Sequence, residues 1–265
     1  MHLTRKFAVV LVATVAVFAL NSCRKKPARN RLDEIQFPPL VLWAWERPED
    51  LRALDGNKFA VAFLAQTLTL KGDEVIFKPR HQPLEVSPDT KIMAVTRIES
   101  QKQTGEHAAL SDAQRQKLVD LIMKTTTLGN VSAIQIDFDA ASSEREFYRS
   151  LLQALRAKLP EHMPLSMTAL ASFCVGDRWL EDLPVDEAVP MIFRMGADDR
   201  TIKTMLSAGD DFREPLCQRS YGIATDETVE LKFKTGRRIY VFNSRSWQTG
   251  DFDSISERIQ RNEVR

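Results

Sequence analysis

Acidic side chains recur where extended apolar segments of this sequence end. Asp137 and Asp139 alternate with apolar residues near the end of Ser132–Ala140, while Glu46 and Glu99 each close another such segment. Carboxylates crowded into one site support acid–base chemistry, because mutual repulsion keeps one of them protonated. These four acids are therefore the candidate catalytic residues.

Other polar or aromatic side chains follow the same kind of segment and are candidates for binding a substrate. They are Arg97, Arg194, Asn243 and Trp247. Two non-catalytic roles stay open for the acids. Arg97 can neutralise Asp137 in an interior ion-pair network that only holds the fold together. Glu46 can cap a helix beginning near Pro48, since carboxylates favour helix starts.

The elements that must position these residues are eight predicted strands, several of them followed by helices. The strands are Leu40–Glu46, Phe59–Ala65, Lys91–Glu99, Ser132–Ala140, Leu165–Ala171, Ala188–Met195, Ser220–Ala224 and Ile239–Ser244. The helices are Pro48–Leu54, Ser111–Thr127, Ser142–Leu159, Asp177–Leu183, Asp198–Ser207 and Phe252–Arg261. This alternation predicts an α/β fold, an irregular (β/α)8 TIM-like barrel, with an open doubly wound sheet as the alternative. A β-hairpin over Thr67–Lys78, turning near Gly72, replaces the second helix.

The polar face of one strand favours the barrel. In Ser132–Ala140, Gln135, Asp137 and Asp139 share a face, and a charged face cannot pack under an amphipathic helix without a large desolvation cost. The acids must therefore point into a common interior. By the same alternation Trp43 and Trp45 lie opposite Glu46, so we expect them under helices.

Composition excludes many standard chemistries. The chain has 37 basic and 36 acidic residues, which is not the charge balance of a nucleic-acid binder, so we expect no nucleic-acid partner. No two glycines lie closer than thirteen positions, so paired-glycine phosphate loops are absent. Cysteines and histidines never approach metal-ligand spacing, and we expect neither a metal nor a cofactor.

Export favours a disulfide between the two cysteines beyond the N-terminus, but their predicted places in the barrel favour unpaired thiols. Cys174 follows the fifth strand at the carboxyl end of the barrel, whereas Cys217 precedes the seventh strand at the amino end. A disulfide requires α-carbons within about 7 Å, less than the height of a barrel.

The N-terminus predicts export. Residues 1–22 combine a basic start with an apolar run too short to span a bilayer, and Leu20-Asn21-Ser22-Cys23 resembles the bacterial lipoprotein box. That resemblance implies cleavage before Cys23, lipidation of Cys23 and anchoring to a lipid bilayer; because residue 24 is Arg, we expect the outer membrane, facing the periplasm. The alternatives are an ordinary signal peptide cut nearby and an uncleaved anchor. Residues 23–37 then form a basic flexible tether and residues 38–265 the barrel domain.

Four passages carry a family resemblance. LVLWAWERPEDLR, AIQIDFDAASSEREFY, PLSMTALASF and VDEAVPMIFRMG together resemble an uncharacterised bacterial family known as a domain of unknown function, family 3142. The resemblance implies a secreted barrel-like protein and supplies no activity.

A more distant likeness concerns the segment with the two aspartates. Ile136-Asp137-Phe138-Asp139 is similar to the strand-four motif of family-18 glycoside hydrolases, which reads Asp-Gly-x-Asp-x-Asp-x-Glu. Ala141 occupies the position of that family's catalytic glutamate, and Arg194 occupies the position of the aspartate in its Met-x-Tyr-Asp motif. Chitinase chemistry by the family's own route is therefore not expected.

The leading hypothesis is a membrane-tethered glycoside-hydrolase-like barrel that acts on an envelope or extracellular polysaccharide through a carboxylate cluster. One competitor is a non-catalytic envelope lipoprotein of the same fold that binds a glycan or a protein. Another is a structural lipoprotein whose buried charges form salt bridges only.

Overall fold

The computed structural model describes residues 29–103, 105–227 and 231–264. The predicted signal peptide, Cys23 and the first part of the predicted tether lie outside these residues. None of the helices in the described part of the chain is long and apolar enough to cross a membrane.

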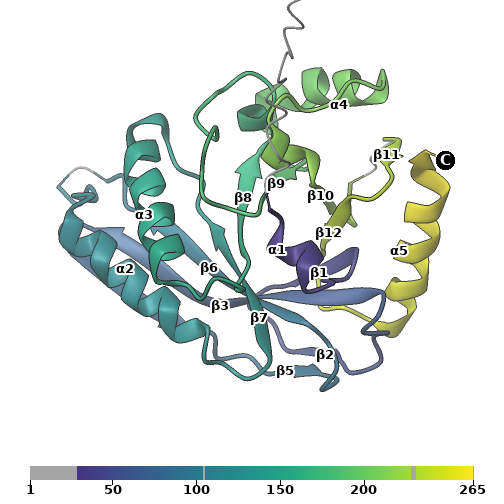
Figure 1. Cartoon of the computed structure of the whole chain (residues 1–265), viewed down its shortest axis with the longest axis horizontal. Helices are drawn as coiled ribbons and strands as arrows, with labels where there is room; N and C mark the ends of the chain where they lie inside the picture. Colours follow the sequence, from purple (N-terminus) through teal and green to yellow (C-terminus); the bar gives the residue numbers. More distant parts are fainter. Residues whose placement is uncertain (1–28, 104, 228–230, 265) are drawn as a thin grey trace, which may run out of the picture.

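Eight parallel strands form a closed barrel (Figure 1). They are β1 (Leu40–Ala44), β3 (Phe59–Lys71), β6 (Ile92–Ser100), β7 (Val131–Asp137), β8 (Leu165–Leu170), β9 (Glu187–Met191), β10 (Ser220–Ala224) and β12 (Arg238–Phe242). Closure is direct, because β1 pairs in parallel with β3 on one side and with β12 on the other. The predicted TIM-like barrel is confirmed, and the open sheet is excluded.

The two faces of each strand meet different apolar cores. On β1, Leu40 and Leu42 belong to the larger core outside the barrel, whereas Val41 and Trp43 belong to a separate interior cluster. The main helices outside the strands are α2 (Asp112–Thr125), α3 (Arg145–Lys158), α4 (Asp199–Ser207) and α5 (Thr249–Asn262). Because side chains alternate along a strand, inward residues share one parity, and this parity decides which side chains reach a site inside the barrel.

The predicted β-hairpin is confirmed. Strand β3 runs on through Lys71, and β4 (Glu74–Pro79) returns antiparallel to it. Gly72 makes the turn at φ +51°, a conformation that glycine adopts without steric cost. No helix stands between β3 and β6 in the sequence, so the second helix of a regular barrel is replaced as expected.

Two of the predicted helices are wrong. In place of a helix over Pro48–Leu54, β2 (Glu49–Leu51) pairs in parallel with β5 (Leu84–Val86). The segment predicted as a helix over Asp177–Leu183 consists of turns and irregular chain. In the first case a strand partner distant in the sequence supplies the hydrogen bonds, which local periodicity does not reveal. Short 3-10 turns are η1 (Ser142–Glu144), η2 (Ala171–Cys174), η3 (Gly196–Asp198) and η4 (Pro215–Gln218), and the remaining strand pair is β11 (Phe233–Lys234) with β13 (Glu263–Val264).

The end of the predicted tether is folded. Residues Arg31–Glu34 form α1, capped by the side chain of Asn30. Leu32 is fully buried in the interior cluster, and Phe37 joins it there. The backbone N–H of Arg31 donates to Asp186 at 2.9 Å. The few apolar residues among the charges are therefore enough to place this segment in the amino end of the barrel, so the residues from Asn30 onward do not belong to a flexible tether.

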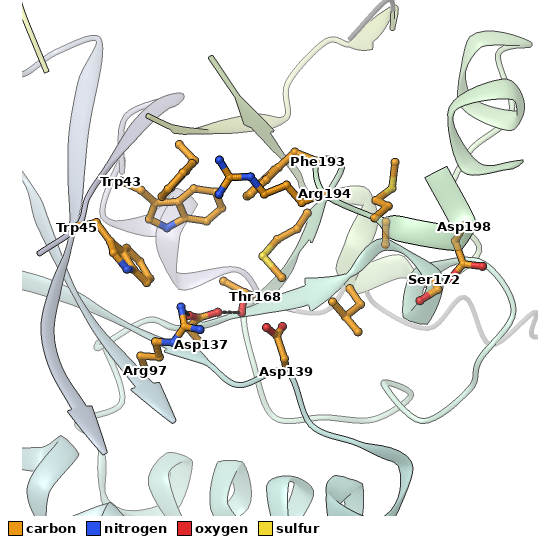
Figure 2. A pocket seen from close by; sticks show the side chains of 15 residues that line it. Trp43, Trp45, Arg97, Asp137, Asp139, Thr168, Ser172, Phe193, Arg194 and Asp198 are labelled. Carbon is orange, nitrogen blue, oxygen red and sulfur yellow. Dashed lines mark hydrogen bonds and ion pairs between the residues drawn. The ribbon is translucent and has the colours of Figure 1, made fainter. Parts of the chain in front are cut away.

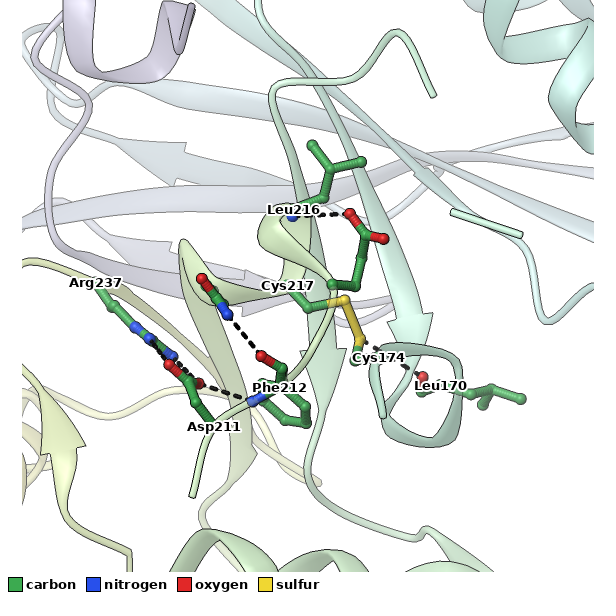
Figure 3. Close-up of a disulfide and its surroundings, with 9 residues drawn as sticks. Leu170, Cys174, Asp211, Phe212, Leu216, Cys217 and Arg237 are labelled. Carbon is green, nitrogen blue, oxygen red and sulfur yellow. Dashed lines mark hydrogen bonds and ion pairs between the residues drawn. A yellow bond between two sulfur atoms is a disulfide. The ribbon is translucent and has the colours of Figure 1, made fainter. Parts of the chain in front are cut away.

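The prediction of unpaired cysteines is also wrong: Cys174 and Cys217 form a disulfide with α-carbons 5.8 Å apart (Figure 3). The two turns that contain these cysteines, η2 and η4, both contact β9, a strand of only five residues. The backbone N–H groups of Arg213 and Glu214 donate to the carbonyl of Cys174. The chain before β10 thus passes beside η2, and the height of the barrel does not separate the two cysteines.

Candidate functional site

A pocket of about 390 Å³ opens at the carboxyl ends of the barrel strands (Figure 2). In TIM barrels this end carries the active site, because loops from all eight strands converge there. Side chains from β1, β6, β7, β8 and β12 and from the loop after β9 line it. Four of the eight predicted site residues take part: Asp137, Asp139, Arg97 and Arg194.

Asp137 is the buried acid of the pocket. It ends β7, is 7% exposed, accepts a hydrogen bond from the Thr168 hydroxyl at 2.7 Å, and lies 3.8 Å from the Arg97 guanidinium. Burial raises the pKa of Asp137 to about 6 and the negative charge of Asp139 adds to the rise, while the Thr168 bond and Arg97 oppose it. A proton is therefore available on Asp137 near neutral pH.

Asp139 is the exposed acid. It lies two residues beyond Asp137 on the same face and also lines the pocket, with its carboxylate open to solvent. Within the described residues no hydrogen bond or ion pair holds this side chain. A carboxyl group that is open to solvent and has no protein partner can contact a ligand in the pocket.

Arg97 and Glu99 mark one side of the pocket. Arg97 donates to Glu99 at 3.0 Å, and its guanidinium lies 5.8 Å from the centre of the Trp45 ring. Glu99 does not line the pocket itself; it lines an adjoining hollow of about 270 Å³ that shares Arg97 and Asp139 with it. The ion pair expected between Arg97 and Asp137 is present, next to an open site.

An aromatic wall faces the carboxylates. It consists of Trp43 from β1, Trp45 just after β1, Phe193 after β9 and Phe242 from β12. Phe193 and Phe242 stack in parallel at 5.7 Å, Trp45 meets Phe242 edge-on at 6.2 Å, and Trp43 meets Phe193 at 6.2 Å. Such flat apolar surfaces suit the faces of sugar rings or of other planar ligands.

The expectation that Trp43 and Trp45 pack under helices is therefore wrong, and Glu46 explains why. Placing Glu46 inside the barrel put the two tryptophans outside, but the structure shows the opposite parity. Glu46 lies on the outer side, where it forms a 3.0 Å ion pair with Lys78 of the hairpin. It does not cap a helix either, because none begins near Pro48.

Asn243 and Trp247 are also outside the pocket. Asn243 is 2% exposed and accepts a hydrogen bond from the Thr225 hydroxyl. Trp247 is 5% exposed; its indole N–H donates to the backbone carbonyl of Trp43 at 3.0 Å and its backbone N–H donates to Glu49. Both support the strand ends from behind, and neither offers a surface to a ligand.

Several pocket residues escaped the sequence analysis. Thr168 is a polar residue inside an apolar strand, while Ser172 and Asp198 stand in the loops after β8 and β9. Asp198 carried the same signal as the predicted acids, an acid closely following a strand, but it was assigned to a helix start. In the described part of the chain no three His, Cys, Asp or Glu side chains are grouped as a metal site requires.

Comparisons with known proteins find similarity to one family over part of the chain and to a few solved structures. Solved structures similar to it include a family GH18 chitinase from Chromobacterium violaceum, at 13% identity over 78% of each chain with a TM-score of 0.48. Another is the chitinase domain of the spore coat protein CotE from Clostridium difficile, at 13% identity over 68% of this chain and 57% of that one, with a TM-score of 0.39. No curated protein matches the chain in sequence. Residues 88–190 match the model of a domain of unknown function, DUF3142, which confirms the predicted resemblance to that family.

Proposed function

We propose that the pocket binds a saccharide chain and hydrolyses a glycosidic bond. One observation carries the proposal: an aromatic wall, the buried carboxyl group of Asp137 with its raised pKa and the exposed carboxyl group of Asp139 line one pocket. Glycoside hydrolysis needs this combination, because one carboxyl group protonates the leaving oxygen while the other acts as base or nucleophile. The carboxyl end of a barrel is also where such a site is built.

The two acids take different roles. Asp137, with a pKa of about 6, keeps a proton on about one molecule in ten at pH 7 and is the proton donor. Asp139 is exposed and acts as the base that activates water. In this assignment the base activates water directly and forms no covalent bond to the sugar, which is the mechanism of inverting enzymes. We therefore expect inversion at the anomeric carbon; retention would contradict these roles.

The decisive experiment is a panel of polysaccharides assayed for both binding and release of reducing ends. Replacing Asp139 with Asn should lower hydrolysis by about a thousandfold while binding stays within twofold, because the amide keeps the shape but cannot take a proton. Glu46→Gln is the matched control: this acid carries the same sequence signal but lies outside the pocket, so its loss should leave hydrolysis unchanged. Equal hydrolysis by the wild type and Asp139→Asn would refute the catalytic role.

A second function, glycan binding without hydrolysis, is favoured by one observation. Ala141 stands where the similar chitinase motif has its catalytic glutamate, so the strand itself supplies no third acid. In that case the panel would show binding with no reducing ends released. Trp45→Ala would then weaken glycan binding. Asp139→Asn would have no effect on the assay for reducing ends, because the wild type releases none.

For the location we propose an exported, lipid-anchored protein of the outer membrane, tethered through Cys23. Six residues separate Cys23 from Asn30, the N-cap of α1, and an extended chain over this stretch spans at most about 24 Å. Because α1 lies at the amino end of the barrel, this tether would hold that end toward the bilayer and leave the pocket open to the periplasm. Cys23→Ala should release the protein from membranes, and mass spectrometry of the N-terminal peptide should show acyl chains on Cys23.

A further inference from the structure

The backbone of Arg194, at the edge of the pocket, has an unfavourable conformation that contacts with a distant loop maintain. Its φ of +52° lies in the left-handed region, which is unfavourable for any residue with a Cβ and persists where surrounding contacts require it. Those contacts exist: the backbone N–H of Arg194 donates to Glu227 at 2.9 Å, and its guanidinium pairs with Asp226 at 3.0 Å. Its side chain is 54% exposed, so core packing does not account for the strain.

The guanidinium of Arg194 lies on the aromatic wall. Its central carbon is 5.2 Å from the centre of the Phe242 ring, and Phe242 continues into Trp45 through their edge contact. Figure 2 shows Arg194 running across the pocket beside Phe193, with Asp139 on the other side of the view. Arg194 and Asp139 both line the pocket that the aromatic wall borders, so a sugar ring bound in this pocket lies near both residues.

The two arginines of the pocket differ in what they leave free. Arg97 is engaged by two carboxylates, Glu99 and Asp137. Arg194 uses one terminal nitrogen for Asp226, and in the part of the chain that the structure describes its Nε and its second terminal nitrogen bond no protein group. Its remaining N–H groups form a planar fork, the geometry that binds a carboxylate through two parallel hydrogen bonds.

We propose that the saccharide is acidic and that Arg194 binds the carboxylate on its ring. This inference rests on the proposed function and names its substrate class: a sugar bearing a carboxylate, such as a uronic acid, with the ring on the aromatic wall and the carboxylate in the Arg194 fork. The free carboxylate of Asp139 lies apart from Arg194 and stays available for the reaction.

The test compares two ligands that differ only at one group: methyl β-glucuronide, which carries a carboxylate, and methyl β-glucoside, which does not. Titration calorimetry on the folded protein should give the glucuronide at least about tenfold higher affinity, and the preference should shrink with added salt. Arg194→Gln should abolish the preference, so that the glucuronide and the glucoside bind with equal affinity. Arg194→Lys should restore part of it, since an ammonium keeps the charge without the fork.

The control is Arg178→Gln, because Arg178 is an exposed arginine outside the pocket. It should keep the full preference. The comparison is repeated with tetragalacturonate and its carboxyl-reduced form, so that weak binding of single sugars does not decide the result.

Each outcome separates the two proposals. If neutral and acidic ligands bind equally, or if Arg194→Gln keeps the preference, the role of Arg194 is refuted while glycan binding stands. If neither pair binds, and the polysaccharide panel shows neither binding nor hydrolysis, the proposed function fails and this inference fails with it.

Discussion

The two ends of the barrel differ in how completely their buried charged groups are paired. At the amino end, Glu187 is fully buried and its carboxylate accepts hydrogen bonds from the Tyr240 hydroxyl, from Arg238 at 3.2 Å and from Ser166 at 3.3 Å. Arg238 in turn pairs with Asp33 of α1 at 2.7 Å. The Glu187 carboxylate therefore has three hydrogen-bond donors and no contact with solvent, and α1 lies next to its partner Arg238.

The carboxyl end leaves charge unmatched. Asp137 has two partners but a raised pKa, and its neighbour Asp139 stands in an open pocket. The two ends are linked through the interior: the Trp43 indole donates to Gln135 at 2.8 Å, Gln135 donates to Ser166 at 3.1 Å, and Ser166 reaches Glu187. One chain of side chains thus runs from the pocket wall to the amino-end ion pair.

The contrast separates structural charges from functional ones. A buried ion pair with full hydrogen bonding stabilises one arrangement of the barrel, and breaking it is costly because a lone charge is left behind. A carboxyl group with a raised pKa instead reduces stability at neutral pH and is retained where its proton is useful. Changing one acid at each end should therefore give effects of opposite sign.

The largest expected effect is at the amino end. Glu187→Ala should lower the free energy of unfolding by about 5 kcal/mol, because it leaves the Arg238 guanidinium buried without its main counter-charge and removes the partner of the Tyr240 hydroxyl. Urea denaturation measures the change. The double variant Glu187→Ala/Arg238→Met should recover at least half of the loss, since it removes both charges; a loss under about 1 kcal/mol for the single variant would show that the pair is not structural.

The disulfide comes next, since it ties a pocket loop to the chain that enters the amino end of β10. Cys174 and Cys217 are 43 positions apart, so a Cys174→Ala/Cys217→Ala variant should lose about 4 kcal/mol, because its unfolded chain gains the freedom of an open loop. Leu170 and Ser172 next to Cys174 line the pocket, so ligand affinity should fall as well. Denaturation with and without dithiothreitol supplies the control: the reductant should weaken the wild type and leave the variant unaffected.

Asp137→Asn should instead raise the free energy of unfolding at neutral and alkaline pH. The pKa of Asp137 is about 6 in the folded protein, above its unfolded value, so the folded state holds the proton more tightly and wild-type stability falls as pH rises from about 4 through 6. The amide carries no such penalty. The variant should gain up to about 3 kcal/mol over the wild type at pH 8 and almost nothing at pH 4, while losing hydrolysis.

Thermal unfolding across this pH range checks the sign. A difference between Asp137→Asn and the wild type that stays constant from pH 4 to pH 8 would mean that Asp137 does not hold a raised pKa.

The architecture could be predicted from sequence because its signals are local. Each of the eight strands contains an apolar run that the sequence shows, although β3 continues beyond its predicted end into the hairpin, and the Gly72 turn marks that hairpin. What escaped depends on contacts between distant segments. The pairing of β2 with β5, the seat of Leu32 inside the barrel and the approach of Cys217 to Cys174 leave no periodic trace in the chain.

The site was predictable in part, and one parity decision explains the misplacement of Glu46, Trp43 and Trp45. The inward face of β7 was read from charge alone, which placed Asp137 and Asp139 correctly. On β1 both faces carry apolar or amphipathic residues, so the single charge of Glu46 pointed the wrong way. A fixed period of two then moved Trp43 and Trp45 to the wrong side together with it. Where a strand carries only one charged residue, aromatic residues near its end indicate the inward face as well as the charged residue does.

The smallest expected effect tests that parity at the aromatic wall. Trp45 is half-buried at the pocket, so Trp45→Ala should weaken saccharide binding about tenfold, or about 1.4 kcal/mol, through the loss of one stacking surface. Trp247→Phe is the matched comparison, since this tryptophan was the platform expected from sequence but is buried behind the strands. Its loss should leave affinity unchanged and cost only the bond to the Trp43 carbonyl, about 1 kcal/mol of stability. Reversed results in a titration of the same ligand would mean that the saccharide contacts the region of Trp247, outside the pocket at the strand ends.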